Sequence, residues 1–251
     1  MKQSILYVVG IGPGHPAGMT EEARRVIEDC EVIAGYPLYL SLLDTDLSRK
    51  TVIKTGMTGE EERCRRALQS AAEGKKTALV CSGDPGVYGM AGLVLAMQEE
   101  VPGVTVRVIP GVTAATAGAA LLGAPLMHDF AVISLSDRLT PWEKIEKRLL
   151  LAAEADLVIV LYNPESKSRS GYLQKACSIL LPVLPPDRPA ATARNIGREG
   201  EEVWTGTVKE LTNRGGDMFT TVYIGNSTTI LKKGKMITRR GYPGEMRSRE
   251  G

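Results

Sequence analysis

The stretch best suited to hold a small ligand is SGDPG at 82–86, which follows the short apolar run 78–81. Its two glycines can adopt backbone angles that are closed to other residues, and they let a ligand approach the main chain. Asp84 followed by Pro85 is typical of the N-cap and first position of a helix. A strand, a tight turn and a helix N-terminus together form a cradle for a ligand. On this stretch alone, a plain connection between a strand and a helix remains the alternative.

A second glycine-rich loop, GIGPG at 10–14, follows the first predicted strand. A dinucleotide-binding fingerprint would need a third glycine where this chain has His15, and an acidic residue at the end of the next strand. That strand, predicted at 32–34, ends at Gly35. The sequence therefore disfavours a nicotinamide-binding domain. Pro13 stiffens the loop and removes a donor, which suits a shaped wall better than a phosphate-binding nest.

Apolar runs and helical patterns alternate along the chain, which predicts an α/β fold of two domains with mainly parallel sheets. The segment GAPLMHDF at 123–130 interrupts this alternation with glycine and proline. We therefore expect an N-terminal α/β domain over 1–124, a linker over 125–130 and a C-terminal α/β domain over 131–251. The strands are predicted at 5–9, 32–34, 78–81, 104–109, 131–135, 157–162, 190–193 and 219–225.

Ligands of such folds bind beyond the carboxyl ends of the strands. Thr113, near the start of a helix of very small residues, would face these strand ends. The loops at the strand ends come from both halves of the chain, so the sequence predicts a site in the cleft between the two domains. The loops are 10–14, 82–88, 110–114, 162–169, 194–198 and 219–221.

The composition of the 251-residue chain narrows the class of protein. A formal net charge of +2 and the lack of a long basic run argue against a nucleic-acid-binding protein held by a large cationic field. Four separated cysteines, no CxxC pair and two histidines fit a structural zinc site poorly, and no metal is expected. No apolar run approaches eighteen residues, so we expect a soluble cytoplasmic protein with reduced thiols and no membrane contact.

Three glycine-containing motifs occur along the chain in this order: GIGPG at 10–14, SGDPGVYG at 82–89 and PGVTAA at 110–115. Together they resemble the tetrapyrrole methylases, the S-adenosylmethionine-dependent enzymes of cobalamin and sirohaem synthesis. Three longer stretches are GMTGEEERCRRAL at 56–68, HDFAVISLSDRLTPWEKIEKRL at 128–149 and LYNPESKSRSGYL at 161–173. These resemble the precorrin-3B C17-methyltransferase (cobalt-factor III methyltransferase) branch, whose members also contract the macrocycle.

The resemblance covers residues 4–240 and departs from the branch at two places. GYPLYL at 35–40 differs from the usual stretch, and Glu165 stands where a basic residue is common. We therefore assign no substrate contact from the family to these two places. The resemblance implies two α/β domains with the cofactor in the cleft and a homodimer as the usual assembly.

The resemblance also implies S-adenosyl-L-methionine as methyl donor and S-adenosyl-L-homocysteine as product. Methyl transfer from a sulfonium is an in-line displacement, so the enzyme chiefly aligns donor and acceptor and excludes water. It needs neither a metal nor a protein nucleophile. Matching positions assign the cofactor contacts, most of them through backbone groups, to Pro13, Gly83, Asp84, Val87, Tyr88, Thr113, Ala114, Tyr162, Asn163, Asn195, Thr220 and Thr221.

A methylated tetrapyrrole carries many carboxylates, so a cationic rim is expected around its binding site. The candidate substrate-binding residues are Gly12, Arg138, Lys167, Arg169 and Arg194, with Arg198 beside them. Ring contraction requires proton transfer, which calls for a general acid or base. The candidate catalytic residues are His128, Asp129, Ser134, Ser136 and Asp137. A solvated surface charge remains the alternative for each cation, and a structural role the alternative for His128.

The leading hypothesis is S-adenosylmethionine-dependent C17-methylation of precorrin-3B, or of its cobalt counterpart, with ring contraction in cobalamin biosynthesis. The nearest alternative is a sibling methylase acting at C11 or C20, or on uroporphyrinogen. A protein that binds S-adenosylmethionine or a tetrapyrrole without turnover is another, and a nucleotide-binding oxidoreductase is a third. The sequence leaves open whether the substrate already carries cobalt.

Overall fold

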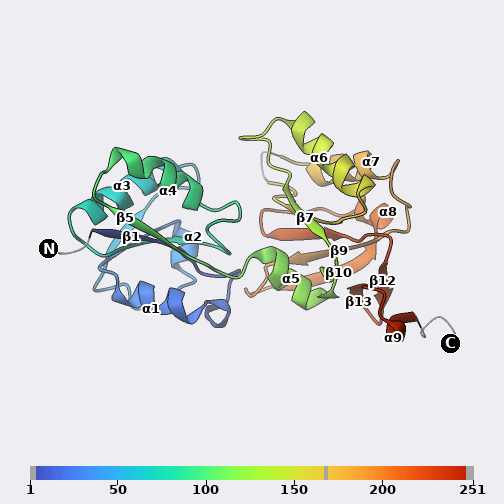
Figure 1. Cartoon of the computed structure of the whole chain (residues 1–251), viewed down its shortest axis with the longest axis horizontal. Coiled ribbons are helices and arrows are strands. Elements are labelled where there is room, and N and C mark those ends of the chain that lie inside the picture. The colour runs from blue at the N-terminus through green and yellow to red at the C-terminus, as the bar shows by residue number, and fades with distance from the viewer. Residues whose placement is uncertain (1–3, 167–168, 247–251) are drawn as a thin grey trace. The chain divides into compact units, whose positions relative to one another are not determined.

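The computed structural model describes residues 4–166 and 169–246 of the chain. The chain forms two compact units, Met1–Ala114 and Ala115–Gly251 (Figure 1). Each unit contains a five-stranded sheet with helices packed against it, which confirms the predicted α/β fold class. Over the described ranges, no helix combines the length and the apolar character needed to cross a membrane.

The sheet of the first unit is parallel throughout, with the strand order β3-β2-β4-β1-β5. Its central strands are buried along nearly their whole length, as continuous apolar runs predict for strands covered on both faces. The short edge strand β3 lies outside the predicted strands. The strands are β1 (Ile5–Gly10), β2 (Val32–Gly35), β3 (Thr51–Lys54), β4 (Thr77–Cys81) and β5 (Thr105–Ile109).

Helices α3 and α4 cover one face of this sheet and α1 covers the other (Figure 1). Because side chains alternate along a strand, Leu6 and Val8 of β1 pack toward α3 and α4, whereas Val9 packs toward α1. The hydroxyl of Thr20 caps α1 by accepting the Ala23 N–H at 3.1 Å. The helical segments are η1 (Pro16–Gly18), α1 (Glu21–Asp29), α2 (Pro37–Leu40), α3 (Glu60–Ala72), α4 (Ala91–Met97) and η2 (Gln98–Glu100).

The sheet of the second unit has the order β10-β9-β11-β8-β7, and its only parallel neighbours in the described chain are β7 and β8. The prediction of a mainly parallel sheet is therefore wrong for this unit. Strand β10 follows β9 through a short turn, and β11 inserts antiparallel between β8 and β9. Parallel neighbours need a long crossover, which α6 supplies only between β7 and β8. The strands are β7 (Phe130–Ser134), β8 (Val158–Tyr162), β9 (Pro189–Arg194), β10 (Glu202–Thr207) and β11 (Thr220–Ile224).

The division between the units falls between Ala114 and Ala115, before the position expected from the sequence. Helix α5 (Ala114–Leu122) and strand β6 (Gly123–Ala124) follow it, and β6 pairs with β13 (Lys235–Thr238), itself paired with β12 (Thr229–Lys232). The Thr238 hydroxyl also donates to the Pro125 carbonyl at 2.6 Å. The first residue of the segment predicted as a linker over 125–130, Pro125, is thus bonded to β13, and its last residue, Phe130, begins β7.

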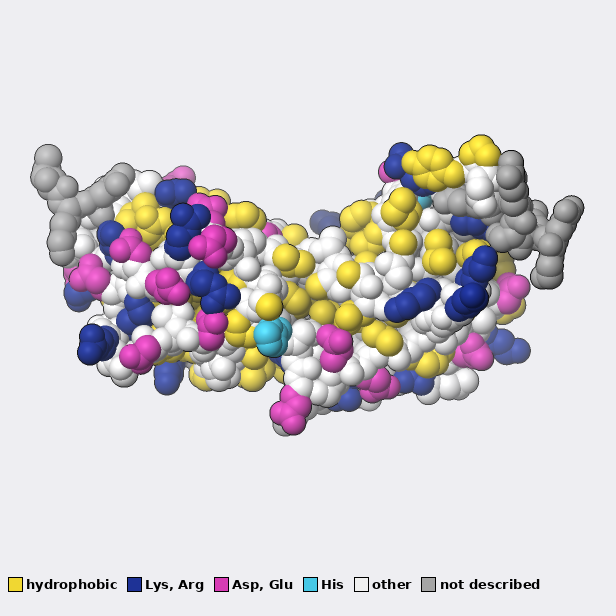
Figure 2. Space-filling view, turned by 90° about the horizontal axis from the view of Figure 1, so that it is seen from below, with side chains coloured by type: hydrophobic (Ala, Val, Ile, Leu, Met, Phe, Trp, Pro, Cys, Tyr) yellow, Lys and Arg dark blue, Asp and Glu magenta, His cyan; other side chains and the backbone are white. Residues whose placement is uncertain are grey.

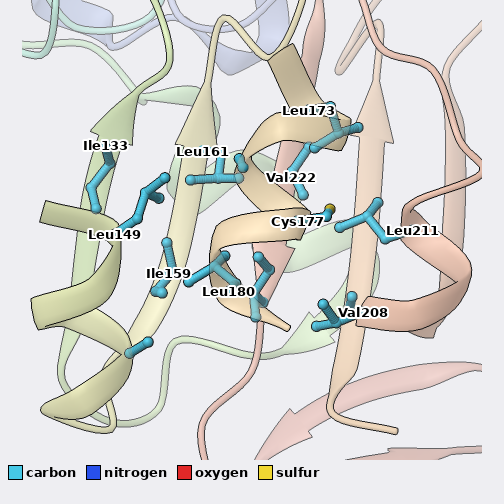
Figure 3. Packing of buried hydrophobic residues seen from close by; sticks show 14 of the residues in the cluster. Ile133, Leu149, Ile159, Leu161, Leu173, Cys177, Leu180, Val208, Leu211 and Val222 are labelled. Atoms are coloured by element: carbon cyan, nitrogen blue, oxygen red, sulfur yellow. The ribbon is translucent and has the colours of Figure 1, made fainter. Parts of the chain in front are cut away.

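Helices α6 (Trp142–Glu154), α7 (Tyr172–Leu180) and α8 (Val208–Leu211) pack on the sheet of the second unit, and a short α9 (Pro243–Met246) follows. Figure 3 shows Leu149 of α6 beside Ile133, and Cys177 and Leu180 of α7 lying over the strands. Each fully buried aliphatic side chain of this kind contributes about 1.5–3 kcal/mol. This core fixes the position of α7, and therefore of Tyr172 at its start.

All four cysteines, Cys30, Cys64, Cys81 and Cys177, are buried free thiols. Burial raises the pKa of Cys30 and Cys81 to about 12, and the pKa of Cys64 and Cys177 to about 11. The thiols therefore stay protonated and unreactive at neutral pH, as expected of packing residues.

We expect these thiols to make the folded state less stable at alkaline pH. A group whose folded pKa is raised contributes fully below its unfolded pKa and loses that contribution as the pH rises toward the folded value. Above an unfolded pKa of about 8.5, each thiol should therefore cost about 1.4 kcal/mol per pH unit until its folded pKa is reached. Urea unfolding at about pH 7.5 and about pH 10 measures the loss. Cys177→Ala should show a smaller fall than the unchanged chain, and equal falls would contradict the assignment.

Candidate functional site

Three glycines bring the main chains of three loops together at the carboxyl edge of the first sheet. Gly10 ends β1, Gly83 follows β4 and Gly111 follows β5. A Cβ on Gly10 would lie 2.7 Å from the Gly111 nitrogen and 2.7 Å from the Gly83 carbonyl oxygen, and one on Gly111 would overlap that same oxygen. Only residues without a side chain permit this approach. We call the loops 10–14, 82–88 and 110–114 the glycine edge.

Hydrogen bonds fasten the loops of the glycine edge to one another. The Gly12 N–H donates to the Gly83 carbonyl at 3.2 Å, and the Gly83 N–H donates to the Gly12 carbonyl at 2.8 Å. The Asp84 carboxylate accepts the Gly86 N–H at 2.7 Å through Oδ1 and the Gly111 N–H at 3.0 Å through Oδ2. Asp84 therefore closes its own turn and ties that turn to the next loop.

The prediction that Asp84 and Pro85 begin a helix is wrong. Helix α4 begins at Ala91, and Tyr88, in the turns that precede it, takes the left-handed region at φ 53°. The Asp84 carboxylate accepts the N–H two residues ahead, which is the turn that aspartate commonly forms. The Tyr88 side chain is 56% exposed, so this segment presents an aromatic ring at the surface.

The structure brings the first-unit candidates together on the glycine edge. A Cβ on Gly83 would lie 3.7 Å from the Thr113 Cα and 3.9 Å from the Ala114 nitrogen, so the main chains of these loops line one surface. This arrangement suits a ligand bound through backbone N–H and carbonyl groups. The candidates on this edge are Gly12, Pro13, Gly83, Asp84, Val87, Tyr88, Thr113 and Ala114.

In the second unit, the carboxyl ends of β7, β8 and β9 share one edge of the sheet with the start of β11. The strand register pairs Ser134 with Tyr162 and Arg194 with Thr220. Because β11 runs antiparallel to β9, its first residues meet the last residues of β9. We call this the second-unit edge, and it carries the remaining cofactor candidates, Tyr162, Asn163, Asn195, Thr220 and Thr221.

Two asparagines of the second-unit edge brace the loops that follow their strands. Asn163 and Asn195 take left-handed φ values of 53° and 51°, which asparagine tolerates better than most residues. The Asn163 side-chain amide donates to the Ser134 hydroxyl at 3.0 Å, and that hydroxyl also accepts the Ser136 N–H at 3.2 Å. The Asn195 amide donates to the Gly200 carbonyl at 3.2 Å.

Two tyrosines hold the first turn of α5 against the second sheet. The Ala115 N–H donates to the Tyr162 hydroxyl at 2.6 Å, and the Tyr223 hydroxyl donates to the Ala115 carbonyl at 2.9 Å. The N–H groups of a helix start lack partners within the helix, so Tyr162 supplies one. A side chain on Gly118 would overlap the Tyr223 hydroxyl, so glycine there lets α5 approach. Burial raises the pKa of Tyr223 and keeps it a donor.

Arg194 is paired with an acidic side chain. Its Nε and Nη2 lie 2.9 and 2.8 Å from Oδ2 of Asp217. The other oxygen of Asp217 accepts the Phe219 N–H at 2.9 Å and the Thr220 hydroxyl at 2.8 Å. Asp217 therefore offsets the charge predicted to bind substrate, and it orients Thr220. Sequence reasoning missed Asp217, although an aspartate three residues before a strand-opening threonine is a recognisable turn signal.

The predicted catalytic residues do not form one group. His128 and Asp129 precede β7 at its amino end, with His128 Nδ1 3.6 Å from Asp129 Oδ2 and side chains 47% and 85% exposed. Ser136 and Asp137 follow the opposite end of this strand of 5 residues. At about 3.3 Å per residue, the strand separates the two pairs by roughly 16 Å. Of the candidates, Ser134, Ser136 and Asp137 lie at the second-unit edge, and His128 and Asp129 do not.

Tyr172 is a functional candidate that sequence reasoning missed. Its hydroxyl donates to Asp137 Oδ2 at 2.7 Å, and this hydrogen bond, more than burial, raises the pKa of Tyr172. Its ring packs edge-on against Trp142, with ring centroids 5.1 Å apart. The usable signal was position: Tyr172 begins α7 directly after Gly171, and a helix that follows β8 starts at the edge where β8 ends.

Only some of the basic side chains predicted to form a cationic rim are without a partner that would compete with a substrate. Arg138 is exposed and has no polar partner among the described residues. Arg169 donates through Nε to the Ser166 hydroxyl at 3.2 Å, and its buried Nη1 has no hydrogen-bond partner in the described ranges. The Arg198 guanidinium lies 5.2 Å from the centroid of the Phe219 ring. Lys167 lies outside the described residues.

A hollow in the first unit lies at the opposite, amino ends of β2 and β3, where Val32 and Thr51 line it. Lys50, also in its lining, donates to the carbonyls of Glu28 and Cys30 at 2.7 Å each. The Lys50 ammonium therefore satisfies carbonyl groups at the C-terminal end of α1. The hollow has no part in the glycine edge. Figure 2 shows basic and acidic side chains interspersed over the first unit. Within the described ranges, no group of three or more His, Cys, Asp or Glu is placed to hold a metal.

Comparison with known proteins gives consistent matches. Residues 5–212 match the family model described as tetrapyrrole (corrin/porphyrin) methylases. A probable cobalt-factor III C(17)-methyltransferase from Salmonella typhimurium is 48% identical over 239 residues, covering 95% of this chain and 99% of that protein. A precorrin-3B C(17)-methyltransferase from a Sinorhizobium species is 41% identical, covering 95% and 93%. The crystal structure of the methyltransferase CobJ matches with a TM-score of 0.87 at 35% identity, covering 93% and 99%.

Proposed function

Because this chain belongs to the tetrapyrrole methylases, we propose that it methylates C17 of precorrin-3B, or of its cobalt-bearing counterpart, and contracts the macrocycle in cobalamin biosynthesis. The observation that carries this proposal is the end-to-end likeness to the Salmonella protein, at 48% identity with 99% of that protein covered. The proposed methyl donor is S-adenosyl-L-methionine and the proposed by-product is S-adenosyl-L-homocysteine. When bound, this cofactor supplies an electrophilic methyl group carried on a sulfonium.

The glycine edge fits such a donor. Its surface is made of main chain, because the glycines at 10 and 111 let the three loops approach one another. The Asp84 carboxylate adds one negative charge beside it, which complements the positive charges of a sulfonium and an amino group. We assign the first-unit candidates to this cofactor, with Asp84 acting through the shape and charge of the loops.

We assign the second-unit candidates to the same cofactor, because this edge is held in a fixed shape. The side chains of Tyr162, Asn163, Asn195 and Thr220 already hold Ala115, Ser134, Gly200 and Asp217. Several of their backbone groups are engaged as well, since the Asn195 and Thr220 N–H groups donate to the Phe219 and Asp217 carbonyls and the Tyr162 carbonyl accepts the Leu135 N–H. These residues therefore give the edge a fixed shape against which a ligand can bind. These residues bind and orient, and the displacement itself needs no group from the protein to form a covalent bond.

Arg138 is our candidate for a carboxylate of the tetrapyrrole. Its exposed guanidinium has no partner in the described chain, whereas Arg194 is paired with Asp217. Arg138→Ala should raise the KM for the tetrapyrrole about tenfold and leave kcat nearly unchanged, because an arginine–carboxylate bond contributes about 1.5 kcal/mol in ground and transition states alike. Steady-state kinetics measures both constants. Arg148→Ala, at an exposed position of α6, is the matched control. An equal KM in both variants would remove Arg138 from the substrate site.

The direct test of the function is incubation with methyl-labelled cofactor and each candidate substrate, metal-free and cobalt-bearing precorrin-3 compounds included. The expected product carries one additional labelled methyl group, at C17, and a contracted macrocycle, both identified by mass spectrometry and NMR. Methylation without contraction, or at C11 or C20, would favour a sibling methylase. Saturable cofactor binding without transfer to any precorrin would favour a binding protein.

A further proposal concerns the assembly, the location and the partners of the chain. We propose that the chain works as a homodimer in the cytoplasm and needs no nucleic acid, membrane or resident metal. Light scattering at several protein concentrations tests the assembly. A mass of one chain at every concentration, in an active preparation, would contradict it.

A further inference from the structure

Asp137 and Tyr172 stand 35 residues apart in the chain and meet at the second-unit edge. Tyr172 donates its hydroxyl hydrogen to Oδ2 of Asp137 at 2.7 Å. In the described chain, the other oxygen, Oδ1, has no hydrogen-bond partner, and Asp137 is half-buried. One oxygen of the carboxylate is therefore held, and the other stays open to accept a proton.

The Tyr172 ring is held by its neighbours. It packs edge-on against Trp142 at 5.1 Å, and the Lys175 ammonium lies 3.9 Å from the Trp142 ring centroid. Leu173, the next residue, is buried in the core of the second unit. The hydroxyl is thus presented to Asp137 by a rigid helix start rather than by a mobile side chain.

Two other acidic side chains near this edge, Asp217 and Glu165, already hold partners. Asp217 pairs with Arg194 and Thr220, and Glu165 accepts the Gly171 N–H at 3.2 Å. His128 and Asp129 lie at the far end of β7. Asp137 differs from Asp217 and Glu165, because a side-chain hydroxyl holds one of its oxygens while the other oxygen stays open.

We propose, on the premise of the proposed function, that Tyr172 is a positioning residue that orients Asp137 to accept the proton released when the macrocycle is methylated. The macrocycle supplies the electron pair of the new C–C bond, and the pair of the broken S–CH₃ bond stays on sulfur. The positive charge that arrives with the methyl group then leaves the macrocycle as a proton. That proton passes to Oδ1 of Asp137 and from there to water.

The kinetic test compares Tyr172→Phe, Asp137→Asn and the double variant with Tyr7→Phe. Tyr7 lies in the first unit, and its hydroxyl has no hydrogen-bond partner in the described ranges. General-base catalysis is worth about 10²–10⁴-fold, so Asp137→Asn should lower kcat by at least about 100-fold. Tyr172→Phe should lower kcat about tenfold with an unchanged KM. The double variant should match Asp137→Asn, because Tyr172 acts only through Asp137.

A second measurement needs neither cofactor nor substrate. With tyrosines ¹³C-labelled at Cζ, Tyr172 is identified by the signal lost in Tyr172→Phe, and its alkaline titration is followed by NMR. Because the hydrogen bond to Asp137 raises the pKa of Tyr172, Asp137→Asn should lower its titration midpoint. An unchanged midpoint would show that the pair does not form in solution and would overturn the inference.

The remaining outcomes separate the two proposals. If the unchanged chain methylates no precorrin, the proposed function fails, and the base role fails with it. If the unchanged chain is active and Tyr172→Phe turns over like Tyr7→Phe, only the inference fails. A tenfold loss from Tyr172→Phe that persists in the Asp137→Asn background would likewise overturn it, since Tyr172 would then act independently of Asp137.

Discussion

Gly111→Ala is expected to destabilise the protein by about 3 kcal/mol or more and to abolish cofactor binding. The added Cβ would overlap the Gly83 carbonyl oxygen and lie 2.8 Å from the Gly10 Cα. Both obstacles are backbone atoms of central strand ends, so neither can rotate away. Any shift that relieves the overlap moves Gly83 and breaks its paired hydrogen bonds with Gly12. Urea unfolding and calorimetric titration with S-adenosyl-L-homocysteine measure the two effects.

Gly92→Ala is the matched control for this prediction. A Cβ on Gly92 would meet nothing within 4 Å, and the residue lies inside α4. Alanine there should stabilise the helix by up to about 1 kcal/mol. If Gly111→Ala unfolds at the same urea concentration as the unchanged chain, the close approach of the three loops is not present in solution.

Asp84→Ala is expected to weaken cofactor binding by at least about tenfold. The substitution removes two bonds to backbone N–H groups, those of Gly86 and Gly111, and charge-assisted bonds of this kind contribute about 1.5–3 kcal/mol each. The 82–88 loop then loses its tie to the 110–114 loop, and the negative charge beside the proposed donor is lost as well. Calorimetry with S-adenosyl-L-homocysteine gives the change in Kd.

Asp84→Asn separates the two contributions of this carboxylate. Its side-chain oxygen can still accept one of the two N–H groups, but the negative charge is gone. Binding close to that of the unchanged chain would show that loop geometry dominates, and binding as weak as in Asp84→Ala would show that charge dominates. Unchanged binding in Asp84→Ala, together with lost turnover, would contradict the role assigned here and make Asp84 a catalytic residue.

Local sequence patterns were sufficient for most of the first unit. Strands β1, β2 and β4 fall where apolar runs predict them, because a strand covered on both faces must be apolar along its length. The glycines of GIGPG and SGDPG predicted loops that a ligand can approach. The close approach of these loops to one another and to PGV, which only glycine allows, was found in the structure. The helix expected at Asp84 failed because the same residue types also form a turn, and only the partners of its carboxylate distinguish the two.

The second unit depended more on tertiary structure. Its strands were predicted, but the antiparallel insertion of β11 between β8 and β9 was not, because strand order depends on packing summed over the whole unit. The same topology separates His128 from Asp137, although they are close in sequence, by placing them at opposite ends of β7. A local sequence segment does not show which residues of other strands will lie beside it at the same edge of the sheet.

The chain's order of glycine loops, apolar strands and branch-like segments was therefore enough to identify its family and the loops of the proposed cofactor site. Tertiary structure alone decided which side chains are available within those loops. Asp217 reaches Arg194 across 23 residues and Tyr172 reaches Asp137 across 35. Such contacts leave no local signal, because spacing within one segment determines only its periodicity and turns. The partner of a charged or hydroxyl group is chosen by the elements that folding brings beside it.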